Sequence, residues 1–328
     1  MQENQGHRFS IAPMMDWTDR HCRYFHRLLS KHALLYSEMV VADAVLMGDR
    51  DYLLGGCNDV EGVALQLGGS DRGKLAQAAR IGAEYGYCEI NLNVGCPSDR
   101  VKSGTFGACL MHQPELVGDC VKAMVDAVDI PVTVKCRIGV DDQDIGLALD
   151  ELAHSVWQAG SARLWVHARK AWLEGLSPKE NREIPPLNYP RVYQLKRENM
   201  NQFIGINGGI ENLIQVDEHL DEVDGVMMGR EAYHNPRMLR HVDQQIFGAI
   251  NPPINFSQIC EEMAAYSEQH LAKGGRLHQI TRHMLGLFHG VPGARRYRQI
   301  LSVEAARPGA GAKVIFDAFA AIQHDIAA

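Results

Sequence analysis

The stretch that decides the fold is CEINLNVGCP, residues 88–97. Its first part alternates polar and apolar side chains. The polar positions of this alternation are Glu89, Asn91 and Asn93. Because successive side chains of a strand point to opposite faces, the pattern predicts a strand with one polar and one apolar face. Gly95 and Pro97 then indicate a fixed turn, which presents Cys96 at the end of the strand.

Two later runs, residues 132–138 (VTVKCRI) and 163–168 (RLWVHA), show the same alternation. Their polar parity consists of Thr133, Lys135, Arg137, Arg163, Trp165 and His167. The apolar parity is expected to pack against helices, so the polar parity must face inward. Burying such groups without partners would cost several kcal/mol. Either a polar ligand or an internal ion-pair network must therefore satisfy them, and the residues alone leave both possibilities open.

Outward from these runs, short aliphatic segments alternate with segments of helical period. The predicted strands are residues 8–14, 34–40, 63–67, 88–94, 132–138, 163–168, 203–207 and 225–229. Eight βα units in about 240 residues match the size of a (β/α)8 TIM barrel. The glycine motifs of dinucleotide-binding and P-loop sheets are absent from the sequence. We therefore predict an α/β fold built on a TIM barrel.

The pattern changes after Asn251-Pro252-Pro253, where only helical periodicity follows. We predict a catalytic barrel over residues 1–250 and a small all-α helical domain over residues 251–328. Within the barrel, the longest connection is 169–202, with four prolines and one short helical pattern. A connection of this length usually has a function at the barrel mouth.

Composition excludes several classes of protein. Of 328 residues, 46% are hydrophobic and 22% are charged, which excludes disorder as the main state. No apolar run approaches the ~18 residues of a membrane span, and the first residues lack an apolar signal segment. The eight cysteines form no CxxC pair, which argues against zinc and dithiol sites. We expect a cytoplasmic monomer that binds neither a metal nor a membrane.

Glycines follow the seventh and eighth predicted strands. The first group is Asn207-Gly208-Gly209, and the second is Gly229-Arg230. Barrels commonly bind phosphate with these two loops, where glycine lets backbone N–H groups approach an anion and arginine adds a forked donor. The first group alone could be an ordinary turn. The pair of groups indicates a phosphorylated cofactor or substrate.

Cys96 is the chemically distinctive residue of the opening stretch. Most cysteines are packed thiols, but this one is expected at the catalytic end of the barrel. A cysteine nucleophile usually needs an adjacent base, and neither neighbour is a histidine. An ordinary thiol, with a reference pKa of ~8.5, is mostly protonated at pH 7 and can donate a proton.

Several motifs fall at the ends of the predicted strands. They are APM at 12–14, VALQL at 63–67, NLNVGCP at 91–97, VTVK at 132–135, HARK at 167–170, INGG at 206–209 and MGR at 228–230. With these motifs, the whole chain resembles the tRNA-dihydrouridine synthases, flavin enzymes that reduce the C5=C6 bond of uracil in tRNA. Residues 16–25, 175–187 and 281–295 are similar to the A-type bacterial subfamily, which is associated with positions 20 and 20a of the D-loop.

The resemblance implies an FMN cofactor that is reduced by NADPH and that passes hydride to C6 of uracil. Cys96 would donate the proton, with Asn93 beside the target base. Lys135 would stabilise negative charge at the N1 and O2 edge of the flavin. The remaining implied FMN contacts are Ala12, Pro13, Met14, Gln66 and His167 at the ring, and Asn207, Gly208, Gly209, Gly229 and Arg230 at the phosphate.

A protein with a net charge of −7 needs a local basic surface to bind tRNA. Residues 271–300 contain six Lys and Arg residues and no acidic residue. Because screening acts over ~8 Å, this local charge matters more than the total. We predict tRNA contacts at Arg182, Arg295 and Arg298, although the basic segment could instead be a solvated helical face. The uracil would leave its loop stack to enter the barrel mouth.

Two other functions fit part of the sequence. A flavin barrel could act on a free pyrimidine, but a small substrate would not require the basic helical segment. A non-catalytic RNA-binding protein could use the barrel as a scaffold, but the inward polar residues argue against this. A purified sample without a flavin absorption band at about 450 nm would leave only the scaffold interpretation.

Overall fold

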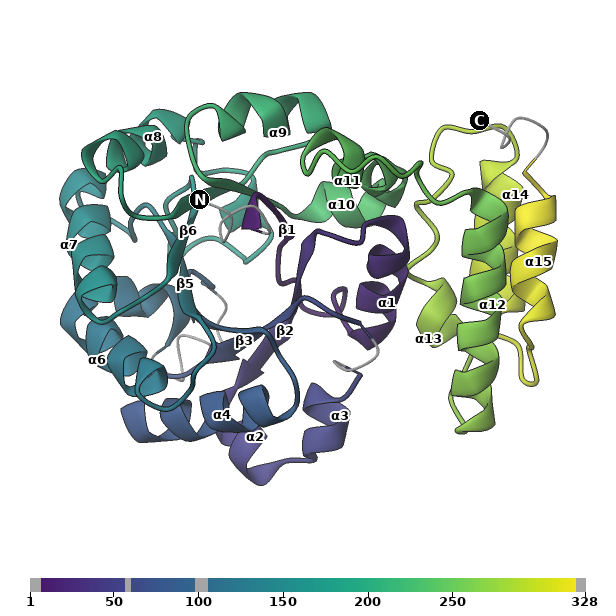
Figure 1. The fold of residues 1–328 in the computed structure, drawn as a ribbon, viewed down its shortest axis with the longest axis horizontal. Helices are drawn as coiled ribbons and strands as arrows, with labels where there is room; N and C mark the ends of the chain where they lie inside the picture. Colours follow the sequence, from purple (N-terminus) through teal and green to yellow (C-terminus); the bar gives the residue numbers. More distant parts are fainter. Residues whose placement is uncertain (1–6, 57–59, 98–105, 323–328) are drawn as a thin grey trace. The chain divides into compact units, whose positions relative to one another are not determined.

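The computed structural model describes residues 7–56, 60–97 and 106–322. The chain forms two compact units, and each is assembled from segments that are separated in the sequence. The first unit comprises Met1–Met15 and Leu34–Gly229, and the second comprises Asp16–Ala33 and Arg230–Ala328. Figure 1 shows the barrel of the first unit and the helices of the second.

The first unit contains a closed barrel of parallel strands in the order β1 to β8. The strands are β1 (Phe9–Ile11), β2 (Leu34–Val41), β3 (Val63–Gly68), β4 (Glu89–Val94), β5 (Val132–Arg137), β6 (Arg163–His167), β7 (Ile204–Asn207) and β8 (Gly225–Met228). Each strand pairs with its neighbour in sequence, and β8 closes the barrel on β1. The predicted TIM barrel and all eight predicted strands are confirmed.

Helices surround the strands of this unit in Figure 1. They are α2 (Ala42–Met47), α3 (Arg50–Leu54), α4 (Arg72–Glu84), α6 (Pro114–Val125), α7 (Ile145–Gln158), α8 (Tyr189–Glu198) and α9 (Leu213–Leu220), with short 3-10 turns η2 (Gly107–His112) and η3 (Glu180–Arg182). Local chemistry determines where α6 and α7 begin. Pro114 opens α6, and the Asp144 side chain accepts hydrogen bonds from two backbone N–H groups of α7.

The strand alternation places side chains as the sequence predicts. Ile90 contacts the position of Gly82 on α4, so the apolar parity of β4 faces the helices. Glu89 instead bonds side chains from three other strands across the barrel. Trp165 also faces inward and leaves no space for a side chain at Gly205, where an added Cβ would lie 2.2 Å from the indole.

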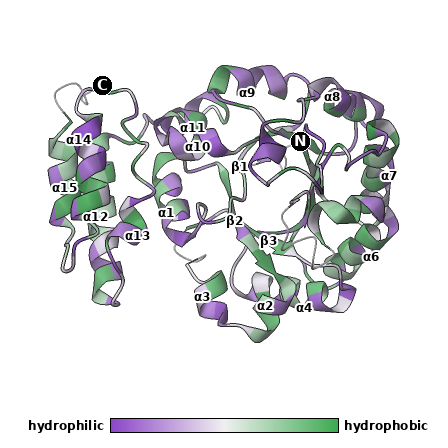
Figure 2. Cartoon of the chain, turned by 180° about the vertical axis from the view of Figure 1, so that it is seen from behind, coloured by the Kyte–Doolittle hydropathy of each residue, from purple (hydrophilic) through white to green (hydrophobic). Residues whose placement is uncertain are grey.

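The second unit is helical. Its helices are α1 (Arg20–Leu29), α10 (Arg230–His234), α11 (Val242–Gln245), α12 (Phe256–Ala272), α13 (His278–Thr281), α14 (Ala294–Gln299) and α15 (Lys313–Ala320), with a 3-10 turn η4 (Pro236–His241) and a π turn η5 (Ile300–Glu304). Phe288 packs against the rings of Phe256, Tyr297 and Phe319 at centroid distances of 4.9–5.4 Å. Figure 2 shows both hydrophobic and hydrophilic residues on α12 and α15, as expected for amphipathic helices.

The second unit begins earlier than the predicted helical domain and also includes α1, which lies between β1 and β2 in sequence. Asp19 explains this grouping. Its Oδ1 accepts hydrogen bonds from the backbone N–H groups of His21 and Cys22, and its Oδ2 accepts one of 2.6 Å from Arg282. His283 Nε2 lies 3.0 Å from the same carboxylate. The division into functional domains at residue 250 stays a prediction.

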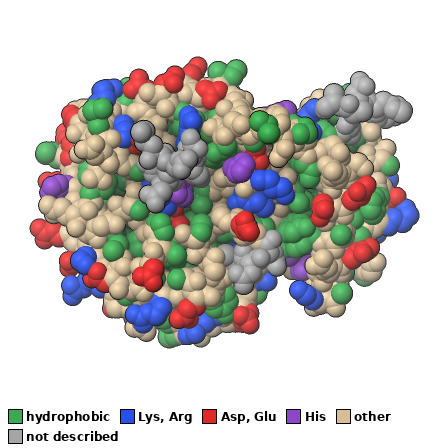
Figure 3. Space-filling model, in the orientation of Figure 1, with side chains coloured by type: hydrophobic (Ala, Val, Ile, Leu, Met, Phe, Trp, Pro, Cys, Tyr) green, Lys and Arg blue, Asp and Glu red, His purple; other side chains and the backbone are tan. Residues whose placement is uncertain are grey.

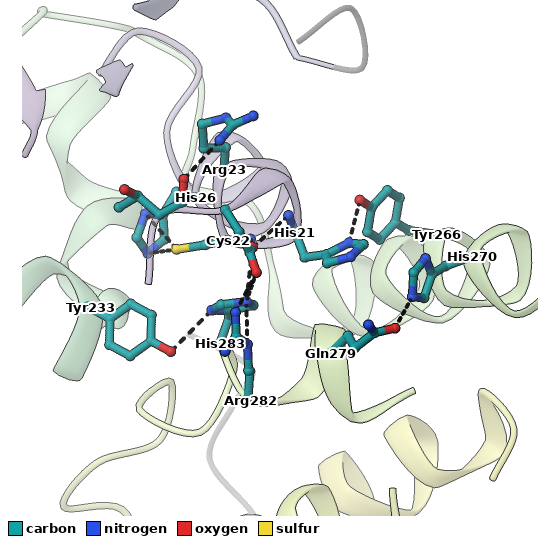
Figure 4. Close-up of polar contacts among 12 residues, drawn as sticks. His21, Cys22, Arg23, His26, Tyr233, Tyr266, His270, Gln279, Arg282 and His283 are labelled. Atoms are coloured by element: carbon teal, nitrogen blue, oxygen red, sulfur yellow. Dashed lines mark hydrogen bonds and ion pairs between the residues drawn. The ribbon is translucent and has the colours of Figure 1, made fainter. Parts of the chain in front are cut away.

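Aromatic and histidine contacts reinforce the attachment of α1, as Figure 4 shows. His21 Nδ1 lies 2.8 Å from the Tyr266 hydroxyl, and the ring of Tyr24 stacks on Tyr266 at a centroid distance of 3.9 Å. Burial alone would raise the pKa of Asp19, but hydrogen bonds and the charge of His283 hold it well below its usual range. The start of α1 is therefore fixed by charged contacts to Arg282 and His283, which follow α13, and the helix is fixed to α12 by an aromatic contact.

In the described parts of the chain, no helix combines the length and the apolar character that a membrane span requires.

Candidate active site

The backbone on both sides of Cys96 is fixed by hydrogen bonds. Asn93 Oδ1 accepts bonds from the N–H groups of Gly95 (3.1 Å) and Cys96 (2.9 Å). Ala108 donates its N–H to the Cys96 carbonyl at 2.9 Å, and Arg137 Nε donates to the Gly95 carbonyl at the same distance. The Cys96 side chain itself is half-buried. The turn therefore holds a partly exposed thiol in one place at the end of β4.

Gln66 and Asn93, two of the predicted site residues, contact each other. Asn93 Nδ2 donates to Gln66 Oε1 at 2.8 Å, and Gln66 Nε2 donates to Asn91 Oδ1 at 2.8 Å. Gln66 is 1% exposed and Asn93 is 8% exposed, so neither amide can rely on bulk water for its partners. The Cys96 turn is thus joined to β3 through Asn93.

Deeper in the barrel, the polar side chains satisfy one another. Asn91 Nδ2 donates to Thr133 Oγ1 at 2.8 Å, and Thr133 donates to Glu89 Oε1 at 2.5 Å. Arg163 forms a 2.6 Å ion pair with Glu89 Oε2, and the Tyr36 hydroxyl donates to Oε1 at 2.5 Å. The internal network that the sequence left open is therefore present at this depth, and it accounts for the inward polar residues of β4 and the first halves of β5 and β6.

Lys135 and His167 stand apart from that network, near the ends of β5 and β6. Lys135 Nζ donates to Asn207 Oδ1 at 3.0 Å, and Asn207 Nδ2 donates to the Met227 carbonyl at 2.7 Å. Burial, followed by the nearby charge of Arg137, lowers the pKa of Lys135 to about 8. The same two causes place the pKa of His167 well below its usual value, so the imidazole is neutral at pH 7.

The glycines after β7 adopt backbone conformations that favour glycine. Gly208 and Gly209 have φ values of 111° and 71°. A Cβ at Gly208 would come within 2.6 Å of the His167 ring, so the missing side chain allows this backbone to lie against the imidazole. A Cβ at Gly229, after β8, would meet no atom within 4 Å. Arg230 follows directly and opens α10.

This set of residues suits a polar, anionic ligand such as FMN. An ammonium and a neutral imidazole lie at adjoining strand ends, next to a glycine pair whose backbone can approach a ligand closely. The space beside Gly229 is open on the side where a Cβ would project. Among the other predicted FMN contacts, Ala12 is buried and donates its N–H to the Met228 carbonyl, and Pro13 and Met14 follow it half-buried.

Arg137 and Asn181 were not singled out from the sequence as site residues. Arg137 is 3% exposed, and one nitrogen, Nη1, donates to the carbonyls of both Lys170 and Asn181 at 2.9 Å. The loop between β6 and α8 is thereby joined to the Gly95 carbonyl and the Cys96 turn. The inward parity of β5 could have indicated Arg137, but no periodic signal marks Asn181. Arg182, a predicted tRNA contact, is exposed in η3 beside it.

The predicted tRNA contacts Arg295 and Arg298 lie exposed on α14. Two of the six basic residues in 271–300 are paired, because Arg282 binds Asp19 and Arg296 binds Glu304 at 3.0 Å. On the face shown in Figure 3, basic and acidic side chains are interspersed. The charge of that face therefore does not locate an RNA-binding surface.

The fold and the polar strand ends define a (β/α)8-barrel protein with an enzyme-like site. Its residues 10–323 match the family model described as Dihydrouridine synthase (Dus), and the chain belongs to this family.

Curated relatives extend over nearly the whole chain. The tRNA-dihydrouridine(20/20a) synthase of Vibrio vulnificus is 55% identical over 320 residues, which cover 97% of this chain and 98% of the relative. The protein of the same name from Escherichia coli is 56% identical over 311 residues, 94% of each chain. The solved structure of morphinone reductase is similar in fold alone, with a TM-score of 0.51, 13% identity and coverage of 77% of this chain and 88% of that one. In the parts of the chain that the structure describes, no cluster of three or more His, Cys, Asp or Glu residues could hold a metal ion.

Proposed function

We propose that the protein reduces uridine at positions 20 and 20a of the tRNA D-loop to 5,6-dihydrouridine, with FMN as cofactor and NADPH as reductant. The observation that carries this proposal is the Cys96 turn, whose backbone is fixed by Asn93, Ala108 and Arg137. The names of relatives that share over half of their residues with this chain support the substrate and its position. A cytoplasmic location follows from this substrate.

FMN would be held at the strand ends. Lys135 and His167 are proposed to contact its ring together with Ala12, Pro13, Met14 and Gln66, and its phosphate is proposed to bind Asn207, Gly208, Gly209, Gly229 and Arg230. When bound and reduced, FMN supplies the hydride that C6 of uracil accepts. Positively charged Lys135 then offers a counter-charge to an anionic ligand in a region where burial strengthens electrostatic interactions.

Cys96 is proposed to donate the proton to C5 of uracil. The thiol is partly exposed, so a base that leaves its stack can reach it. Both neighbouring peptide groups are fixed, which lowers the cost of holding the donor in place during the reaction. Asn93 would lie beside the base, although its side-chain oxygen already accepts two backbone N–H groups. Its main contribution would then be to hold the turn.

The tRNA is proposed to contact Arg182 in the barrel loop and Arg295 and Arg298 on α14. All three side chains are exposed. A monomer with a catalytic barrel and a helical RNA-binding domain is the simplest arrangement for this function.

The test is formation of dihydrouridine in an unmodified tRNA transcript by purified protein with NADPH. Cys96→Ala should retain bound FMN and NADPH-dependent flavin reduction, but should lose most uridine reduction, by about 100-fold or more, because it lacks the proton donor. Cys88→Ala is the matched control, since that exposed thiol lies at the opposite end of β4 and bonds the Val63 carbonyl.

Normal dihydrouridine formation by Cys96→Ala would remove the proposed role of that residue. Wild-type protein without a flavin band at about 450 nm would contradict the cofactor. Equal rates with NADH would leave the reaction intact but reject NADPH as the specific reductant. Mapping dihydrouridine in tRNA from cells that lack the protein tests the two positions.

A further inference from the structure

An unbroken series of side-chain hydrogen bonds leads from the buried centre of the barrel to the Cys96 turn. It begins at Glu89, which is 0% exposed, and passes through Thr133, Asn91, Gln66 and Asn93. Each bond is between 2.5 and 2.8 Å long. The series ends where Asn93 Oδ1 accepts the N–H groups of Gly95 and Cys96. We name these five side chains the Glu89 chain.

Every bond of the Glu89 chain points the same way, with the donor on the side of Cys96 and the acceptor on the side of Glu89. The reason lies at Glu89, whose oxygens receive hydrogen bonds from Arg163, Tyr36 and Thr133. Burial, and then Glu89 itself, raise the pKa of Tyr36 well above its usual value, so its hydroxyl remains a donor.

The acceptor Glu89 at one end and the two backbone N–H donors at the other therefore favour the same orientation of three amides. Thr133 has a single O–H, and because Glu89 takes it, the Thr133 oxygen is left to accept from Asn91. Asn91 must then direct Nδ2 to Thr133 and Oδ1 to Gln66. Gln66 in turn directs Nε2 to Asn91 and Oε1 to Asn93, which leaves Asn93 Oδ1 for the turn. A flipped Asn93 would oppose its NH₂ to two backbone N–H donors.

We propose that Glu89, Thr133 and Asn91 are positioning residues that act on Cys96 through the amide orientation of Gln66 and Asn93. None of the three is proposed to touch substrate or cofactor. The effect on catalysis rests on the proposed function, whereas the effect on the geometry of the turn does not. Bonds in such a chain polarise one another, so a break in the middle is expected to weaken the far end.

Thr133→Val tests the proposal, because valine has nearly the shape of threonine but can neither donate to Glu89 nor accept from Asn91. Thr133→Ser is the matched control, since it keeps the hydroxyl. Neither substitution changes Glu89, Arg163 or Tyr36, so we expect the Glu89–Arg163 ion pair and the Tyr36 bond to remain in both variants.

The first measurement needs neither flavin nor tRNA. Protein stripped of cofactor is alkylated with iodoacetamide, and the modification of Cys96 is followed over time by mass spectrometry of its peptide. We expect Thr133→Val to change the rate at Cys96 by roughly threefold to tenfold, the range that corresponds to one lost hydrogen bond. Thr133→Ser should match the wild type, and the rate at Cys88 should be unchanged in both.

The second measurement is dihydrouridine formation on a tRNA transcript. Thr133→Val should lower kcat by a similar factor and leave KM for tRNA unchanged, with recovery in Thr133→Ser. Wild-type alkylation and wild-type kcat in Thr133→Val would overturn the proposal. Altered alkylation with unchanged kcat would overturn the part of it that concerns catalysis.

If Thr133→Val does not fold, Thr133→Val combined with Asn91→Leu replaces it, because the double variant removes the Asn91 amide that Thr133→Val leaves without an acceptor. It moves the break in the Glu89 chain to Gln66 Nε2, which loses Asn91 Oδ1. A wild-type protein that makes no dihydrouridine would refute the proposed function, while the alkylation rates would still decide whether the Glu89 chain fixes the turn. The two failures are therefore distinguishable.

Discussion

At the scale of single residues, Lys135 shows that a charged side chain at the polar end of the barrel lowers the stability of the fold. The residue is half-buried, its ammonium group lies 3.0 Å from Asn207 Oδ1, and the charge of Arg137 lowers its pKa further after burial. A lysine with a pKa of about 8 is charged at pH 7, but the folded protein holds that proton less tightly than the unfolded chain does. This residue therefore destabilises the fold at neutral pH.

We predict that the free energy of unfolding of Lys135→Met at pH 7 exceeds that of the wild type by roughly 1–3 kcal/mol, because the substitution removes a desolvated charge. The variant should therefore unfold at a higher urea concentration. The gain in stability should be full below pH 8. It should shrink as the pH rises from 8 toward the pKa of free lysine, because the wild-type side chain is then neutral in the folded and in the unfolded state. The same variant should bind FMN more weakly in a fluorescence titration.

Lys122→Met is the control for this measurement, because Lys122 is exposed and pairs with Asp126 on the surface of α6. Its substitution should change the free energy of unfolding little, both at pH 7 and above pH 8. Equal or lower stability of Lys135→Met at pH 7 would show that Lys135 has partners that compensate its burial.

Residue positions were more predictable than residue partners. The alternation in β4, β5 and β6 predicted which side chains face inward, and Glu89, Lys135 and His167 do so. The pairing of Glu89 with Arg163, 74 residues later, could not be predicted, because the register of non-adjacent strands and the depth of each side chain decide it. Depth also decides which polar groups are left for a ligand.

At the scale of elements, the loop between β6 and α8 is built around one amide. Asn181 is 0% exposed, and its Nδ2 donates to the carbonyls of Trp172, Leu176 and Ser177. Its Oδ1 accepts the N–H of Trp172 at 2.7 Å. The loop thus satisfies backbone groups that no helix or strand satisfies. This organisation places Arg182, the next residue, on its surface.

We predict that Asn181→Ala opens this loop. The substitution removes the four side-chain hydrogen bonds that Asn181 makes to the loop backbone, so we expect a loss of roughly 2 kcal/mol in unfolding free energy and new protease cleavage between residues 171 and 184. Limited proteolysis followed by mass spectrometry measures the cleavage.

Asn199→Ala is the matched control, because Asn199 is less buried and its side chain bonds only the Leu195 carbonyl among the described contacts. It should show neither cleavage in the loop nor a comparable loss of stability. Cleavage that is equal in both variants would indicate general loosening instead of a role for Asn181.

The predictability of the elements follows their periodicity. All eight strands were predicted, because their spacing of apolar and polar side chains is a local signal. The structure of the loop from 170 to 188 was not predicted, because it depends on a single buried asparagine and no periodic pattern of residues indicates that role. Carbonyls of this long connection accept hydrogen bonds from Arg137, and the expected function of the connection at the barrel mouth stays a prediction.

At the scale of the whole molecule, the two units were less predictable than the barrel. The change in pattern at residues 251–253 predicted a helical region, but α1 and residues 230–250 also belong to the second unit. Nothing in the spacing of α1 distinguishes it from a barrel helix, because its apolar face looks the same whichever unit it covers. The ion pair of Asp19 with Arg282 spans 263 residues and has no local signature.

The distribution of unpaired charge over the second unit leads to a prediction about RNA. Arg295→Glu combined with Arg298→Glu should weaken tRNA binding and reduce the salt dependence of log K by about 2, roughly one for each lost phosphate contact. Flavin content should not change. Binding is measured by filter retention or anisotropy at several salt concentrations.

Arg296→Glu on the same helix is the control, because Arg296 is already paired with Glu304 and is expected to contribute little to RNA binding. A salt slope that is unchanged in the Arg295→Glu, Arg298→Glu protein would place the RNA elsewhere on the molecule.

The position of α1 has a practical consequence for anyone who cuts or recombines this chain. If roughly the last hundred residues were expressed alone, Arg282 and His283 would lose the Asp19 carboxylate. Tyr266 would lose its ring contacts with His21 and Tyr24. Conversely, grafting a foreign barrel onto the helices would import the wrong first helix. An exchange of the helical unit that keeps its contacts must therefore include residues 16–33 as well as residues 230–328. We expect substitutions in these two segments to be coupled.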